Sequence, residues 1–329
     1  MLMLDAEAIM NRLSYTTLVN ELRAMHLGPK TSHSDLLMES AGAGDITNHF
    51  LIRAGWQPGE AVGAKIVSIF PGNNQDRAWP SIQAVYLLFE GKNGTPVACL
   101  DGTAITYLKT ATDSALGAQI LAREDITSML MIGAGEMARH LIAAHCAIRP
   151  SIKEVFVWNR TASKARQLCE GELPKLFGQV KFSAVEDLAQ SVVKVGLISS
   201  ATATSTPLIQ GEWLQAGTHI DLVGAFTPEM READDECLRR ASLFVDARET
   251  TVEHIGELMI PIAESVIIAD DVRADLSELC QEKHPGRGSA DEITLYKNGG
   301  GGHLDLMVAR IMHKYCQSPS PLPSPRGQG

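Results

Sequence analysis

The chain has 329 residues, with 29 Lys and Arg against 39 Asp and Glu, which gives a formal net charge of −10. This length suggests two domains, and the acidic balance argues against a general nucleic-acid-binding protein, which would present a basic face. No apolar run approaches the ~18 residues of a membrane-spanning helix, and Asp5 and Glu7 stand where a secretory signal would be basic. We therefore expect a cytoplasmic protein without nucleic-acid or membrane partners.

The first third of the chain is expected to combine helices with antiparallel strands. Residues 5–27 have helical periodicity, because apolar residues recur every three to five positions. Three β-rich segments follow at 65–70, 84–90 and 96–100, and the turn sequence GKNGT between the last two indicates a hairpin. A further helix is expected from Ala104 to Ala122.

Strands and helices alternate in the middle of the chain. This alternation is typical of βαβ units, and it predicts a parallel sheet covered by helices. A last helix is expected at 303–316, and residues 317–329 are rich in Pro, Ser and Gly, which predicts a disordered tail. The strands that we expect in the alternating region are 128–132, 154–158, 194–199, 219–223 and 243–245.

A glycine motif follows the first of these strands. Residues 133–138 read G-x-G-x-x-A and run into a helical stretch. Gly133 permits the tight turn, Gly135 lets the backbone approach a pyrophosphate, and the small Ala138 lets the helix pack on the strand. The helix N-terminus offers free N–H groups to phosphates. The motif therefore predicts a dinucleotide site that includes Gly133, Ala134, Gly135, Glu136 and Met137.

The end of the second strand indicates which dinucleotide binds. An NAD site carries Asp or Glu at this position to hold the ribose 2′-hydroxyl, whereas this chain has no carboxylate there. Arg160 can pair with a 2′-phosphate, assisted by Asn159, Thr161 and Lys164. The alternative is that Arg160 is simply a solvated residue at a strand end. We predict NADPH as the cofactor, with NADH as a weaker possibility.

The cysteines and histidines give no sign of a metal site. The six cysteines lie far apart with no C-x-x-C pair, and the ten histidines have neither H-x-x-x-H nor H-E-x-x-H spacing. We expect reduced thiols and no bound metal.

Several stretches resemble the ornithine cyclodeaminase/mu-crystallin family. They are GAKIVSIFPGN, the run from PSIQAVYLLFE to LKTATDSALGA, MIGAGEMARHLIAAH and VFVWNRTASKA, and the likeness extends from about residue 15 to about residue 313. The resemblance implies an α/β protein in which a Rossmann-type dinucleotide domain with a parallel sheet is inserted into a mixed α/β domain. That outer domain binds the substrate and forms a homodimer in the family.

The resemblance therefore gives each part of the chain an expected role. Residues 1–120 and 303–316 would form the substrate-binding and dimerisation domain. Residues 121–302 would form the NADP-binding domain, and 317–329 the tail. The glycine run at 299–302 lies near the active site in the resemblance, and it reads equally well as an anion-binding turn or as a flexible hinge.

The resemblance also implies a set of basic residues that hold the α-carboxylate of a small amino or imino acid. Lys65 matches the family lysine, and Lys109 stands where the family usually has arginine. An earlier family arginine falls at Lys30, with Arg53 as a rival. From the residues alone, Lys65 could instead be a snorkelling lysine at a strand end. Lys109 could form an ordinary surface pair with Asp113, four residues on.

One position departs from the cyclodeaminase pattern. Cyclodeaminases carry an aspartate after the fifth strand, where it acts on the substrate amine, and this chain has Phe226 there. A phenyl ring can neither accept a proton nor attract an ammonium group, so cyclodeamination would lose its acid–base partner. Asp221 and Glu229 are possible substitutes, although neither is preferred. In this respect the chain is similar to the ketimine reductases of the family.

The resulting expectation is an NADPH-dependent oxidoreductase of proline metabolism. It would reduce Δ1-pyrroline-2-carboxylate to L-proline, and Δ1-piperideine-2-carboxylate to L-pipecolate as a further reaction. Lys65 or an ordered water would supply the proton, and the backbone around Ala201, Thr202 and Ala203 would line the nicotinamide. The alternatives are an ornithine cyclodeaminase, an alanine dehydrogenase, and an NADPH-gated binding protein of the mu-crystallin kind.

Overall fold

The computed structural model describes residues 1–42, 46–73, 79–171 and 173–317. The chain divides into two compact units. Unit 1 comprises Met1–Ser14, Pro29–Lys109 and Gly301–Gly329, and unit 2 comprises Tyr15–Gly28 and Thr110–Gly300. Most of the expected tail, residues 318–329, lies outside the described residues.

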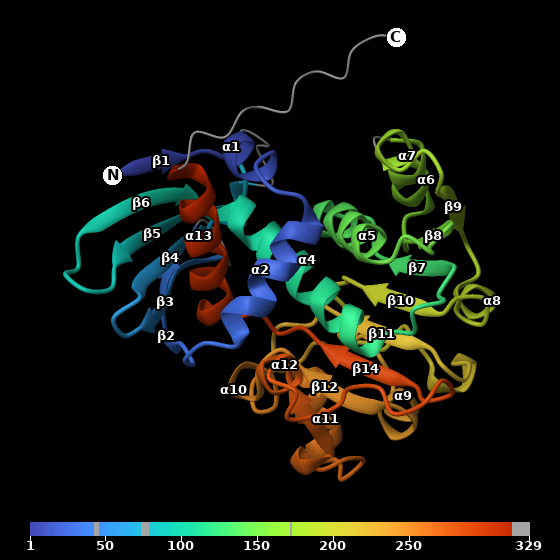
Figure 1. Ribbon diagram of the computed structural model, residues 1–329. Helices are drawn as coiled ribbons and strands as arrows, with labels where there is room; N and C mark the ends of the chain where they lie inside the picture. The colour runs from blue at the N-terminus through green and yellow to red at the C-terminus, as the bar shows by residue number, and fades with distance from the viewer. Residues whose placement is uncertain (43–45, 74–78, 172, 318–329) are drawn as a thin grey trace. The chain divides into compact units, whose positions relative to one another are not determined.

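Unit 1 is built on a six-stranded sheet (Figure 1). Its strands β2 to β6 form an antiparallel meander, and β1 pairs in parallel with β6. The long helix α13, Gly302–Gln317, packs along β2 to β5. The strands in spatial order are β1 (Leu2–Leu4), β6 (Pro96–Asp101), β5 (Ile82–Glu90), β4 (Ala61–Ile69), β3 (Thr47–Gln57) and β2 (Ser32–Ala41), with the short helix α1 (Ala6–Met10) after β1.

Strand register brings three polar side chains into one row on the face that α13 covers. Arg53 pairs with Lys65 across β3 and β4, and Lys65 pairs with Tyr86 across β4 and β5. Directly paired residues project to the same side of a sheet, so the three side chains are neighbours. Gly55 lets the start of α13 approach, because a Cβ there would lie 2.7 Å from the Gly302 carbonyl oxygen.

Unit 2 contains an eight-stranded sheet in which every described pairing is parallel. Its strands in spatial order are β13 (Val272–Asp275), β12 (Ser242–Val245), β14 (Thr294–Lys297), β11 (His219–Leu222), β10 (Leu197–Ser200), β7 (Ser128–Ile132), β8 (Glu154–Trp158) and β9 (Lys181–Val185). The chain runs outward from β7 through β8 to β9 and then returns to β10 on the other side of β7. This reversal is the point where doubly wound sheets bind their ligands.

Helices flank the unit 2 sheet and cover its apolar side chains (Figure 1). The core joins buried Leu, Ile and Val side chains of five central strands, among them Leu130, Ile198, Ile220, Leu243 and Leu295. Helix α4 begins in unit 1 and ends in unit 2. The helices are α2 (Tyr15–His26), α4 (Gly102–Leu121), α5 (Glu136–Ile148), α6 (Ala162–Glu170), α7 (Leu173–Leu176), α8 (Leu188–Val192), α9 (Asp235–Arg240), α10 (Arg248–Thr251), α11 (Gly256–Ala263) and α12 (Leu276–Cys280).

The predicted α/β class with a Rossmann-type parallel sheet is confirmed, but several boundaries differ. The helix expected at 5–27 is two helices, α1 and α2, and α2 belongs to unit 2 because its apolar side packs on α5. The boundary expected at residue 120 lies at Lys109, inside α4. Gln317, assigned to the tail, ends α13. Periodicity shows that a helix has an apolar side but not which partner that side contacts.

Candidate active site

The glycine motif lies at the switch point of the unit 2 sheet. Gly133 has φ of +109°, which favours glycine, and a Cβ there would lie 2.7 Å from the Ala201 carbonyl oxygen. Gly135 caps α5, and no atom lies within 4 Å of the position a Cβ would take. Ala138 is buried where α5 packs. The turn therefore has the open backbone that a pyrophosphate requires, and the residues fit a dinucleotide.

The remaining residues of this turn are more exposed. Met137 is half-buried, and Ala134 is half-buried next to the two glycines. Glu136 stands in the first turn of α5 and pairs with Arg139 at 3.1 Å. That pairing moderates its negative charge beside the phosphate position.

The end of β8 carries an exposed arginine that is available for an anion. Arg160 makes no hydrogen bond or ion pair with the described residues. Asn159 donates to the Thr161 carbonyl oxygen at 3.0 Å, and this bond shapes the turn before α6. Lys164 is exposed in the first turn of that helix. The exposed guanidinium of Arg160 and the exposed ammonium of Lys164 both suit a phosphate on the adenosine ribose.

A buried carboxylate joins the loops that follow β10 and β11. Glu232 is fully buried and accepts the Thr202 N–H and hydroxyl, both at 2.8 Å. Its other oxygen accepts the N–H groups of Gly224 at 2.5 Å and Ala225 at 3.2 Å. Ala201 stands directly before this loop, beside Gly133. Both loops leave the carboxyl ends of parallel strands, where the nicotinamide of such folds is held.

The position that carries an aspartate in cyclodeaminases is exposed. Phe226 is 65% exposed on the loop after β11. Of the two possible substitutes, Asp221 is fully buried and accepts hydrogen bonds from Ser114 and Ser199 at 2.7 Å each. Both oxygens of the Asp221 carboxylate are thus already hydrogen-bonded inside the core, whereas Glu229 is exposed. The buried Asp221 is no acid–base group for a substrate.

Unit 1 contains a buried cluster of two lysines and one aspartate. Lys65 lies in the middle of β4, Lys109 on α4, and Asp305 on α13, and each is at most 5% exposed. The Oδ1 atom of Asp305 accepts from Lys65 Nζ at 3.0 Å and from Lys109 Nζ at 3.1 Å. When both lysines are protonated, the cluster holds two positive charges against one negative charge.

Each lysine keeps one N–H that the described residues do not use. An ammonium group has three N–H donors. Lys65 uses one on Asp305 and one on the Thr106 hydroxyl at 3.3 Å. Lys109 uses one on Asp305 and one on the Gly301 carbonyl oxygen at 3.2 Å. The two remaining N–H donors, one on each lysine, and the positive charge of the pair suit the two oxygens of a ligand carboxylate.

The charges within the cluster act on one another's pKa values. Burial lowers the pKa of Lys109 to about 7, with the Asp305 carboxylate opposing the shift and the charges of Lys65 and Arg53 adding to it. Burial acts to raise the pKa of Asp305, but the charges of Lys109, Lys65 and Arg53 outweigh it, and that pKa is lowered. Asp305 therefore stays ionised, while Lys109 titrates near neutrality.

The structure also decides between the alternative roles of Lys65 and Lys109. Lys65 is buried in the strand centre and not at a strand end, so it does not snorkel. Lys109 is buried and contacts Asp305, whereas Asp113 accepts the hydroxyl of Tyr296 at 3.0 Å, so the alternative of a surface pair between Lys109 and Asp113 is wrong.

Arg53 fits the cluster better than Lys30 does. Arg53 lies opposite Lys65, its charge acts on Lys109 and Asp305, and its Nε donates to Asp35 at 2.9 Å. Lys30 is exposed before β2.

Reasoning from the sequence missed the carboxylates Asp305 and Glu232. The signal for Asp305 was an acid within the otherwise apolar first turns of α13, where buried residues flank it on both sides. Nothing marked Glu232 among the acids around it. The sequence reasoning also missed Tyr86, whose buried hydroxyl has no hydrogen-bond partner among the described residues.

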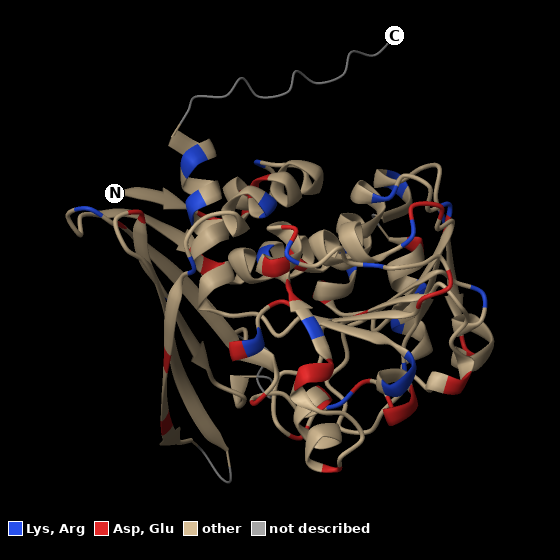
Figure 2. Ribbon diagram, turned by 60° about the horizontal axis from the view of Figure 1, so that its bottom comes forward, with Lys and Arg blue, Asp and Glu red and all other residues tan. Residues whose placement is uncertain are grey.

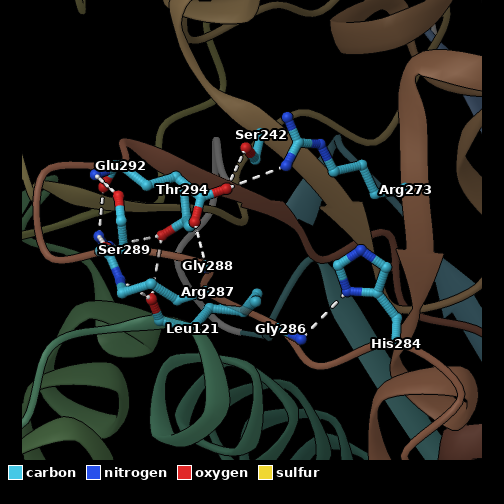
Figure 3. Close-up of polar contacts among 10 residues, drawn as sticks. All are labelled: Leu121, Ser242, Arg273, His284, Gly286, Arg287, Gly288, Ser289, Glu292 and Thr294. Carbon is cyan, nitrogen blue, oxygen red and sulfur yellow. Dashed lines mark hydrogen bonds and ion pairs between the residues drawn. The ribbon is translucent and has the colours of Figure 1, made fainter.

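A second polar network, at the amino ends of strands of the unit 2 sheet, serves the fold. Figure 3 shows Arg287 donating to the Leu121 carbonyl oxygen at 2.6 Å and to Thr294 at 2.9 Å. Glu292 accepts from Arg273 at 3.1 Å and also from Ser242. A cavity of about 560 Å³ lies beside this network. It adjoins the amino ends of the strands, so it is not the dinucleotide site.

The part of the chain that the structure describes contains neither a metal-binding cluster nor a membrane-spanning helix. No cluster of three or more His, Cys, Asp or Glu side chains there could hold a metal. None of its helices is both long and apolar enough to cross a membrane.

Comparison with known proteins gives consistent matches. The model of the ornithine cyclodeaminase/mu-crystallin family matches residues 53–319. A Δ1-pyrroline-2-carboxylate reductase of Paracoccus denitrificans is 44% identical over 299 residues, 91% of this chain and 92% of the relative. The structure of Thermococcus litoralis Δ1-pyrroline-2-carboxylate reductase with NADH and L-proline has a TM-score of 0.86 and 29% identity, and the match covers 96% of this chain and 98% of that one.

A second solved structure shows that this fold also serves another reaction. An archaeal alanine dehydrogenase dimer with bound NAD has a TM-score of 0.82 and 25% identity, and the match covers 96% of each chain. Both solved structures carry a nicotinamide dinucleotide.

Proposed function

This chain belongs to the ornithine cyclodeaminase/mu-crystallin family, and from that premise we propose that it reduces Δ1-pyrroline-2-carboxylate to L-proline. The six-membered Δ1-piperideine-2-carboxylate, which gives L-pipecolate, differs by one methylene and is a second substrate of the same kind. The enzyme is thus an oxidoreductase that acts on a C=N bond. When bound, the reduced nicotinamide supplies the hydride.

The lysine pair carries this proposal. Lys65 and Lys109 are held 3.0 and 3.1 Å from one Asp305 oxygen, and each has one N–H left for the substrate carboxylate. Binding both carboxylate oxygens fixes the ring and presents the imine carbon in one orientation. Arg53 adds positive charge from the neighbouring strand.

Phe226 favours the reductase over the cyclodeaminase. Cyclodeamination needs a group that takes a proton from the substrate amine, and an exposed phenyl ring cannot do so. Reduction of an imine has no such requirement, because the hydride acceptor is the ring carbon. The buried and committed carboxylate of Asp221 does not replace the missing group.

The reaction is tested by following nicotinamide absorbance with the purified protein, NADPH and Δ1-pyrroline-2-carboxylate. Rapid loss of NADPH with formation of L-proline is expected, and L-ornithine with NAD⁺ should give neither ammonia nor proline. Ammonia and proline from ornithine would establish the cyclodeaminase instead. Tight NADPH binding without turnover of either substrate would favour a binding protein.

We propose NADPH as the preferred cofactor, because Arg160 after β8 and Lys164 in α6 are exposed and the end of β8 carries no carboxylate for a ribose 2′-hydroxyl. Arg160→Ser is expected to raise the KM for NADPH about tenfold and to leave the KM for NADH unchanged, since a partly solvated charge-assisted contact contributes about 1–2 kcal/mol. Arg166→Ser is the control, because Arg166 is also exposed, lies on α6 and pairs with Glu186. Equal changes for both cofactors in Arg160→Ser would contradict the assignment.

We further propose a homodimer that covers the outer face of the unit 1 sheet. Every residue of the edge strand β2 is exposed, and the strands of this sheet carry few charges in Figure 2. Apolar patches of this kind mark interfaces, and the archaeal relative is a dimer. The exposed apolar residues on this face are Leu36 (53%), Met38 (56%), Phe50 (40%), Trp56 (56%) and Val85 (42%).

Light scattering tests the dimer. The wild type should have twice the mass of the chain, and Met38→Glu should be monomeric, because it places a charge within the apolar face. Ile268→Glu, which changes an equally exposed apolar residue of unit 2, should remain dimeric. A monomeric wild type would contradict the proposal.

The six free cysteines fit a reducing compartment, and we propose the cytoplasm.

A further inference from the structure

We propose that Asp305 is a catalytic residue whose second carboxylate oxygen holds the protonated ring nitrogen of the imine. The inference rests on the proposed function and names the group that faces the substrate nitrogen in place of the missing cyclodeaminase aspartate.

The two oxygens of Asp305 have different surroundings. Oδ1 accepts from both lysines, at 3.0 and 3.1 Å. Oδ2 is buried and has no hydrogen-bond partner among the described residues. A buried carboxylate oxygen without a donor is costly, so its position calls for an N–H or O–H from a ligand. The lysine donors and this free acceptor belong to one side chain cluster.

The substrate has the matching pattern of charge. Protonated Δ1-pyrroline-2-carboxylate carries a negative carboxylate and a positive C=N–H group on the same ring carbon, so the nitrogen is two bonds from the carboxyl carbon. A carboxylate that accepts the unspent N–H groups of Lys65 and Lys109 therefore brings its ring N–H next to Asp305, which both lysines contact. The positive N–H then meets the one negative group in the cluster.

The other polar groups of the cluster cannot take this role. Lys65 is a cation and so repels a positive N–H group, and the Thr106 hydroxyl, which is neutral, already donates to the Gly102 carbonyl oxygen. Tyr86 also has an unpartnered hydroxyl, but burial and the Asp305 charge raise its pKa well above the usual value, so it stays neutral. A neutral phenol attracts a cationic nitrogen far less than a carboxylate does.

The contact has a direct chemical consequence. Hydride adds readily to the imine carbon only when the ring nitrogen is protonated. A carboxylate beside the nitrogen favours that protonated form. The carbon gains the hydride with its two electrons, and the π electrons of the C=N bond become the lone pair of the nitrogen, which keeps its proton. The neutral amine then takes one proton from water to give the ammonium of L-proline. Asp305 remains a carboxylate throughout.

Two ligands separate this role from a structural one. L-Proline has a ring ammonium, whereas tetrahydrofuran-2-carboxylate has the same ring and carboxylate with an ether oxygen in place of the nitrogen. Calorimetry with the NADPH-bound protein should show Asp305→Asn losing about 50-fold in L-proline affinity. Affinity for tetrahydrofuran-2-carboxylate should be unchanged or higher, because the lysines lose a competing anion.

Other outcomes would overturn the proposal. If Asp305 only positions the lysines, the variant will lose affinity for both ligands equally. If the variant does not fold, the wild type alone decides, since equal affinity for the two ligands would show that nothing negative faces the ring nitrogen. These binding measurements need no turnover, so they are distinct from the imine-reduction assay that tests the proposed function.

Discussion

Lys109→Met is expected to weaken binding of the imine about 100-fold while the affinity for NADPH stays unchanged. The substitution removes one of the two N–H donors for the substrate carboxylate, which is worth about 3 kcal/mol in a buried charge-assisted contact. It also leaves Asp305 with Lys65 as its one lysine partner. The measurements are the KM for the imine and the Kd of tetrahydrofuran-2-carboxylate.

The same lysine predicts how binding depends on pH. Only the protonated ammonium attracts a carboxylate, and the pKa of Lys109 is about 7. Affinity for tetrahydrofuran-2-carboxylate, which does not itself titrate in this range, should be constant below pH of about 6. Above the pKa it should fall by up to about tenfold per pH unit, because an increasing share of Lys109 is neutral.

Lys109→Arg is the matched control. Guanidinium stays charged at all relevant pH values, so this variant should bind tightly and without the fall above neutrality. Lys109→Met should bind weakly with no pH dependence in this range. A wild-type affinity that rises with pH, or a Lys109→Met variant that binds as the wild type does, would remove Lys109 from the site.

Glu232→Gln is expected to lower the free energy of unfolding by about 3 kcal/mol and to weaken NADPH binding about tenfold. All five hydrogen bonds that Glu232 makes through its carboxylate are accepted ones. A glutamine amide presents N–H groups on one side, and these would face either Thr202 or the Gly224 and Ala225 N–H groups. One of the two loops must then move. Thermal unfolding and NADPH titration measure the two effects.

Glu229→Gln serves as the control, since Glu229 is an exposed glutamate three residues earlier in the same segment. Both measurements should be unchanged in this variant, and so should imine reduction. An unaltered Glu232→Gln variant would show that the loops keep their positions without the carboxylate. A large loss of activity in Glu229→Gln would instead make Glu229 the substitute for the missing aspartate.

Local sequence was sufficient to predict the glycine turn and the parallel sheet of the dinucleotide half of the protein. The positive φ of Gly133 favours glycine, the bare backbone of Gly135 leaves room for a ligand, and the small Ala138 is buried where α5 packs, so these requirements are visible in the residues themselves. Strand–helix alternation likewise predicts a parallel sheet, because parallel strands require crossover connections. Three of the eight strands, β9, β13 and β14, were missed, since strands of four or five residues give little period-two signal.

Only the tertiary structure decided how the lysine cluster is built. The sequence, through its resemblance to a family, singled out Lys65 and Lys109, 44 residues apart, but Asp305 follows nearly 200 residues later. Their contact depends on the register of β4 with its neighbours and on the packing of α13 against the sheet. Such long-range packing is set by the whole core, and neither periodicity nor spacing encodes it. The sequence by itself thus determined the kind of residues available for a substrate anion. The fold decided that one carboxylate oxygen of Asp305 holds both lysines and that the other has no partner among the described residues.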